Sequence, residues 1–87
     1  MELNPDDMKA VTLRLKRAHG HLASVIKMLE EGADCEAVLT QLAAVNKAIS
    51  RGGYAIVATG LEQCLAADNG AGEVDAKKIE KLFLALA

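Results

Sequence analysis

The sequence has 87 residues, of which 52 % are hydrophobic and 2 % aromatic, and its formal net charge at pH 7 is −2. This length allows one domain, residues 1–87, and no stretch approaches the ~20 apolar residues needed to span a bilayer. Residues 1–7 are acidic and lack the apolar run of a signal peptide, so we expect a cytoplasmic protein without a membrane partner. The aliphatic content is more than one small domain can bury, which predicts a homo-oligomer.

The first predicted helix starts at Asn4-Pro5-Asp6-Asp7, where Asn4 can cap the N-terminus and Pro5 suits the first helical position. Apolar residues then recur at alternating intervals of three and four, the seam of a packed helix. Seven positions form this seam: Met8, Val11, Leu15, Ala18, Leu22, Val25 and Leu29. Gly32 is expected to end the helix in the left-handed conformation.

A second, long helix is predicted from an Asp34 cap to about residue 66 or 67, with Cys35 in its first turn. Its seam continues the same rhythm through positions 35, 38, 42, 45, 49, 52 and 56. Gly52 and Gly53 in its middle cost about 1 kcal/mol each relative to alanine, so they predict either close approach of another backbone or a kink. After a loop at 68–72, a third helix is expected over roughly 74–86. The predicted fold is all-α, a three-helix protomer with a long second helix.

Basic residues collect in two stretches that contain no acid, 8–29 and 37–61, although the net charge alone speaks against nucleic-acid binding. Such a stripe can bind phosphates, or it can be a solvated helix face. The candidate DNA-binding residues are Arg14, Lys16, Arg17, Lys47 and Arg51. His19 and His21 flank Gly20, and because residues two apart do not share a helix face, we interpret them as surface or phosphate-contacting side chains, not metal ligands.

The two cysteines, Cys35 and Cys64, lie 29 residues apart on one predicted helix, a separation of roughly 43 Å. A disulfide needs Cα atoms within about 7 Å, so the two cannot meet within one subunit unless the helix folds back. They can meet between subunits if two copies of the helix pack antiparallel. In a reducing compartment, free cysteines serve either as reactive or ligating groups or as small buried hydrophobes. The first helical turn favours a thiolate at Cys35, with Cys64 as its resolving partner.

Motifs of enzymes are missing from the sequence. It has no glycine-rich phosphate loop, no nucleophile elbow and no paired-carboxylate motif. We therefore expect neither enzymatic activity nor a cofactor.

Several short segments together resemble one family of bacterial regulators. They are Arg14-Leu15-Lys16-Arg17 with Gly20, Met28-Leu29-Glu30-Glu31-Gly32, Asp34-Cys35, Val38-Leu39-Thr40-Gln41-Leu42-Ala43-Ala44 and Leu61-Glu62-Gln63-Cys64. Over nearly its whole length the chain resembles the copper-sensing operon repressor (CsoR) family. The resemblance implies an antiparallel dimer, a dimer-of-dimers tetramer, and a repressor that leaves its operator DNA when an inducer reaches the cysteines.

The sequence departs from the family pattern at Gly60 and Asn46. Metal-sensing members carry a histidine four residues before the second cysteine, where this chain has Gly60, and many members carry a basic residue in place of Asn46. A dithiol without that histidine resembles the persulfide-sensing branch, the CsoR-like sulfurtransferase repressor (CstR). This likeness implies that reactive sulfur species bridge Cys35 and Cys64 of adjacent subunits.

Two other interpretations stay open at this point. The two thiolates could hold copper(I) in a metal-responsive repressor of the same family, since soft sulfur ligands suit that ion. The chain could also be a helical oligomerisation module without DNA-binding activity.

Overall fold

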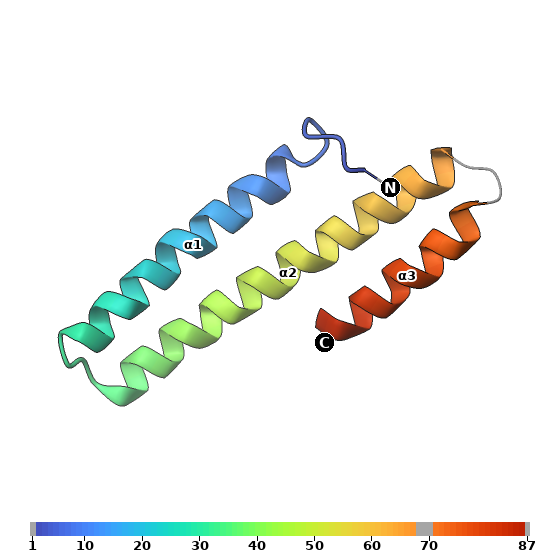
Figure 1. The fold of residues 1–87 in the computed structure, drawn as a ribbon. Helices are drawn as coiled ribbons and strands as arrows, with labels where there is room; N and C mark the ends of the chain where they lie inside the picture. The colour runs from blue at the N-terminus through green and yellow to red at the C-terminus, as the bar shows by residue number, and fades with distance from the viewer. Residues whose placement is uncertain (1, 68–70, 87) are drawn as a thin grey trace.

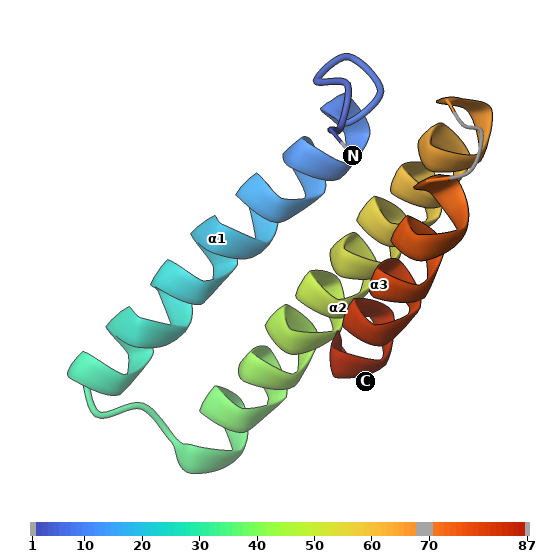
Figure 2. The same ribbon diagram turned by 45° about the vertical axis from the view of Figure 1, so that its right-hand side comes forward.

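In the computed structural model, residues 2–67 and 71–86 are described, and at positions 61–67, 71–76 and 79 the description is of the backbone alone. The chain forms three helices: α1 (Lys9–Glu30), α2 (Cys35–Ala67) and α3 (Ala71–Leu86). α1 and α3 each pack on α2 and run antiparallel to it, on different sides, as the two views agree (Figures 1 and 2). The described residues contain no strand, so the predicted all-α, three-helix protomer is confirmed.

The start of α1 differs from the sequence prediction. Asn4 does not cap it: its side-chain oxygen accepts a hydrogen bond from the Asp6 N–H (2.9 Å), and Met8 is the N-cap. The Asp7 and Met8 N–H groups bond to the carbonyls of Asn4 (3.1 Å) and Pro5 (3.2 Å), three residues back. These three-residue bonds make a tighter turn than an α-helix, so the helix proper begins at Lys9.

The connection between α1 and α2 follows the prediction. Gly32 has φ +73°, the left-handed conformation, and the Ala33 N–H bonds to the Met28 carbonyl at 2.9 Å in the pattern of a Schellman motif. Asp34 then caps α2, because its carboxylate accepts the Ala37 N–H at 3.1 Å. Residues 31–34 thus terminate α1 and start α2 through local hydrogen bonds, and they turn the chain back on itself.

The core lies between α1 and α2. Val25 and Val45 are almost completely buried, and Val38 packs with them, covered by Leu22 and Met28. The predicted seam of α1 is buried or half-buried along its length except at its end, where Leu29 is 63 % exposed.

The seam of α2 divides between two faces. Positions 38, 45 and 52 are buried, whereas 35, 42 and 49 are exposed. A residue four positions after a buried one is rotated by about 40° around the helix, and α1 covers only one side. The uncovered large side chains of this face are Leu39, Leu42 and Ile49, which we call the α2 apolar stripe.

α3 begins at Ala71, earlier than the predicted residue 74, and part of the expected loop, 68–70, lies outside the described residues. Tyr54 of α2 and Phe83 of α3 pack with ring centroids 5.0 Å apart and an interplanar angle of 42°. The molecule measures 55 × 25 × 14 Å, with a radius of gyration of 16.5 Å. A compact domain of this length would have a radius of about 12 Å, so the protomer is elongated.

Candidate nucleic-acid interface and cysteine positions

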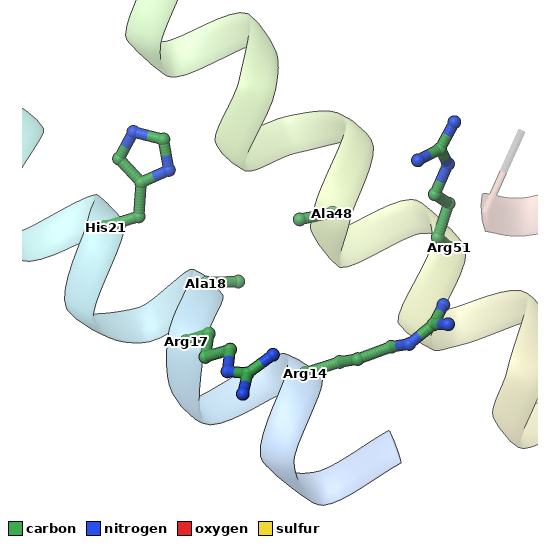
Figure 3. A pocket seen from close by; sticks show the side chains of 6 residues that line it. All are labelled: Arg14, Arg17, Ala18, His21, Ala48 and Arg51. Atoms are coloured by element: carbon green, nitrogen blue, oxygen red, sulfur yellow. The ribbon is translucent and has the colours of Figure 1, made fainter. Parts of the chain in front are cut away.

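A shallow groove of ≈ 320 Å³ runs between α1 and α2 near the middle of both helices. Figure 3 labels the residues that line it, which are Arg14, Arg17, Ala18 and His21 from α1 and Ala48 and Arg51 from α2. Spacings of three and four residues bring each helix's contribution to one face. Ala18, which is 3 % exposed, and Ala48 have small side chains and form the base of the groove, and the arginine side chains form its sides. We call this hollow the arginine groove.

The arginine groove carries positive charge, and none of the described residues neutralises it through an ion pair. Arg14 reaches across from α1 toward α2, below the attachment of Arg51 (Figure 3). Arg14, Arg17 and Arg51 are all exposed, and among the residues that the structure describes none forms an ion pair with them. Guanidinium groups arranged in this way suit phosphate oxygens, which they can bind through two N–H groups at once.

The two lysines predicted with these arginines lie elsewhere. Lys16 lines a separate surface hollow with Pro5, Lys9, Thr12 and Leu13, because two residues of helix separate it from Arg14 by more than half a turn. Lys47 is exposed one turn before Arg51 and does not line the groove. The structure therefore brings together three of the five predicted DNA-binding residues.

A hydrogen bond at the groove's margin joins the two helices. His21 Nε2 lies 2.6 Å from Oε1 of Gln41, a bond in which the ring N–H donates and the amide oxygen accepts. The two residues lie twenty positions apart and meet only once α1 packs on α2, so spacing along the sequence does not predict this bond. His19 is exposed and lines no part of the groove.

The cysteine positions lie toward opposite ends of α2. Cys35 is the first residue of the helix, exposed and in the free thiol form. Position 64 belongs to the same unbroken helix, and its side chain lies outside the described residues. About 43 Å of helix separates the two positions, while 29 residues of helical rotation leave them within about 20° of one another around the axis.

Gly60, one turn before position 64, is buried. A Cβ atom placed there would meet Leu3 Cδ2 at 3.4 Å, so the N-terminal segment covers this position. Without a side chain it offers no metal ligand. No group of three or more histidine, cysteine, aspartate or glutamate side chains gathers anywhere in the described part of the chain. No helix in that part is apolar enough over its length to cross a membrane.

The chain is similar in sequence to known transcriptional repressors. A family model described as metal-sensitive transcriptional repressor matches residues 7–87. The copper-sensing transcriptional repressor CsoR of Mycobacterium ulcerans is 40 % identical over 62 residues, covering 71 % of this chain and 53 % of that protein. The protein of the same name from Mycobacterium tuberculosis is 36 % identical over 56 residues, or 64 % of this chain and 47 % of its own length.

A third relative, the uncharacterized protein YrkD of Bacillus subtilis, is 53 % identical over 38 residues, covering 44 % of this chain and 60 % of YrkD. The chain thus spans about half the length of the CsoR proteins that it matches. No solved structure matches it significantly.

Proposed function

The chain belongs to the metal-sensitive transcriptional repressor family, and we propose that it represses transcription by binding operator double-stranded DNA through the arginine groove. In this proposal it leaves the DNA when copper(I) binds the thiolates of Cys35 and Cys64. The family is one of transcriptional repressors, not of enzymes. The observation that carries the DNA-binding part is that Arg14, Arg17 and Arg51, from two helices, line one groove and have no carboxylate partner among the residues that the structure describes.

Phosphate contacts supply most of the affinity of such a surface and fix its position on the duplex. The groove is shallow and its floor is alanine, so it suits the convex backbone of DNA better than a base edge. Sequence preference would then come largely from DNA shape and deformability. Lys47, one turn from Arg51, extends the same basic face, whereas Lys16 would contact DNA only if the duplex also reached the neighbouring hollow.

A second copy of the chain completes the cysteine site in this proposal. The α2 apolar stripe is uncovered and lies on the face of α2 that also carries Cys35. Two α2 helices packed antiparallel along their stripes would place position 35 of one chain near position 64 of the other, twice, as a two-fold axis requires. Two such dimers would form the homotetramer.

Two thiolates fit copper(I) and do not fit zinc. Copper(I) prefers soft sulfur ligands, whereas a structural zinc site needs four ligands in a tetrahedron. Cys35 is free and accessible at the end of its helix, and Gly60 adds no third donor. The relatives named as copper-sensing repressors support copper(I) over a sulfur species as the inducer.

A persulfide inducer is the second candidate, and the missing side chain at Gly60 favours it. The thiolate of Cys35 would attack the outer sulfur of a persulfide, forming a cysteine persulfide and releasing the donor's thiolate. The thiolate of Cys64 from the partner would then attack the inner sulfur and release hydrosulfide, leaving a disulfide between the chains.

One anaerobic experiment separates these functions. The reduced protein is bound to the duplex that it selects from a random-sequence pool and is then titrated with copper(I) and, separately, with a persulfide donor. We expect copper(I) to release the DNA at about one ion per cysteine pair, and Cys35→Ala to bind DNA but resist release. Release by the persulfide donor alone, with a covalent dimer on a non-reducing gel, would favour the second candidate. Failure to select any duplex would reject the repressor function.

A further inference from the structure

Gly52 lies in the middle of α2 and is buried. A Cβ atom at this position would come within 2.7 Å of Leu15 Cδ2 and 3.2 Å of Leu15 Cγ. Both distances are shorter than ordinary van der Waals contact. Glycine in a helix interior costs about 1 kcal/mol relative to alanine, so its presence here is explained by the close approach of the Leu15 side chain to the α2 backbone.

The contact between Gly52 and Leu15 lies beside the arginine groove on both helices. Gly52 directly follows Arg51, and Leu15 directly follows Arg14. One turn further along, Ala18 and Ala48 form the floor of the groove. The separation of α1 and α2 at the glycine therefore determines how far the arginines of α1 stand from the arginine of α2.

Gly53, the next residue, serves the other side of α2. A Cβ atom there would meet Leu86 of α3, with Cδ1 at 2.8 Å and Cδ2 at 3.2 Å. Adjacent glycines thus receive leucines from two different helices at one level of α2. Only one of the two helices, α1, contributes residues to the arginine groove.

We propose that Gly52 is a positioning residue for DNA binding: by admitting Leu15 against the α2 backbone, it sets the spacing of α1 and α2 at which Arg14 and Arg17 share one groove with Arg51. The inference rests on the proposed DNA-binding function. Gly52 touches no DNA in this scheme, and its effect passes through the helix that Leu15 anchors. A methyl group at position 52 would displace the Leu15 side chain, and we expect α1 to move with it and skew the groove, while the three arginines and their charges stay in the protein.

Gly52→Ala and Gly53→Ala provide a matched test, because both add one methyl group in the same turn of the same helix and bring the same gain in helix propensity. The probe is the duplex that the unchanged protein selects from a random-sequence pool. We expect Gly52→Ala to weaken binding roughly tenfold and to flatten its salt dependence, since fewer phosphates are contacted together. Gly53→Ala is expected to bind DNA with an affinity within about twofold of that of the unchanged protein, because no residue of α3 lines the arginine groove.

A compensating change at Leu15 distinguishes positioning from general damage to the fold. Leu15→Ala combined with Gly52→Ala removes the atoms that the new methyl group meets, so the double variant should recover most of the affinity and the salt dependence. Should Gly52→Ala fail to fold, the double variant still tests the inference: if it folds and does not bind, the inference is wrong.

Two further outcomes would overturn the inference. Either Gly52→Ala binds as tightly as the unchanged protein, or Gly53→Ala loses as much affinity as Gly52→Ala, which would assign the effect to α3. Arg51→Ala, run in parallel, tests the proposed function independently. If Arg51→Ala keeps full affinity and salt dependence, the arginine groove is not the DNA-binding surface, whatever the glycine variants do.

Discussion

Gly32 and Gly20 show how far the surroundings of a residue decide the effect of one and the same substitution. Gly32 has φ +73°, a conformation that costs an L side chain roughly 1–2 kcal/mol, whereas Gly20 lies inside α1 with nothing within 4 Å of an added Cβ. We expect Gly32→Ala to lower the free energy of unfolding by about 1 kcal/mol or more. Gly20→Ala should raise it by up to about 1 kcal/mol. Urea unfolding at one fixed protein concentration measures both changes in the free energy of unfolding. If the two changes had the same sign, the assigned conformations would be contradicted.

Arg14 and Lys16 provide a second comparison at the scale of single residues. Both are exposed cations on α1, but only Arg14 lines the arginine groove. Arg14→Ala should weaken DNA binding by about 1–3 kcal/mol and lower the slope of log affinity against log salt by about one. Lys16→Ala, measured on the same duplex, should have the smaller effect on both. A larger effect of Lys16→Ala than of Arg14→Ala would show that the DNA binds the neighbouring face of α1 instead.

The helices show which parts of the fold follow from sequence. The start of α2 and the Gly32 turn could be predicted because the Asp34 cap and the left-handed glycine act through bonds to residues a few positions away. The predicted start of α1 at Asn4 was wrong, because Asn4 forms its hydrogen bond within a tight turn, which the spacing of apolar residues does not reveal. The division of the α2 seam into a buried and an exposed half depends on which side α1 covers, and spacing along one helix carries no such information.

The candidate site was predictable in its residue types and less so in its geometry. Arg14 and Arg17 share a face by their spacing, but Arg51 joins them only because α1 packs on α2 in one register. Lys16 fell into the same acid-free stretch and faces another hollow, since charge along the sequence says nothing about helix rotation. The bond of His21 to Gln41 has the same origin, in the packing of two helices.

α3 is attached to α2 partly through the aromatic pair, Tyr54 and Phe83. Phe83→Leu keeps an apolar side chain but removes the ring contact, so we expect a loss of about 0.5–1 kcal/mol of stability. Tyr54 is the only tyrosine in the chain, so its near-ultraviolet dichroism reports the pair directly and should weaken. Leu84→Ala, at a position 64 % exposed on the same helix, is the control and should leave that signal unchanged.

Several large apolar side chains of the protomer are exposed on one face of α2. Leu39 is 57 % exposed, Leu42 41 % and Ile49 43 %, all on the α2 apolar stripe. Exposed apolar side chains on one helix face are typical of an interaction surface, and we propose that this one is a subunit interface. This exposure agrees with the aliphatic excess noted in the sequence.

A charge on the stripe tests the assembly. Leu42→Glu should shift the reduced protein from oligomer toward monomer in light scattering, because an unpaired carboxylate would have to be buried in the interface. Thr12→Glu adds the same charge at an exposed position of α1 and should leave the mass unchanged. If both variants keep the mass of the unchanged protein, the stripe is not the interface.

The shortest dimension of the molecule, 14 Å, is little more than the 10–12 Å diameter of a single helix with its side chains. A plate this thin shields few side chains from water, so we expect neighbouring copies to contribute to its stability. Folding then obeys mass action: any species that binds only the folded chain raises the melting temperature as its concentration rises. We expect the Tm of the reduced protein to increase with protein concentration in calorimetry, whereas a constant Tm would mean that the plate is stable alone. In a cell, such a protein would be degraded when its concentration is low and would persist when its concentration is high, so the lifetime of the protein would depend on its abundance.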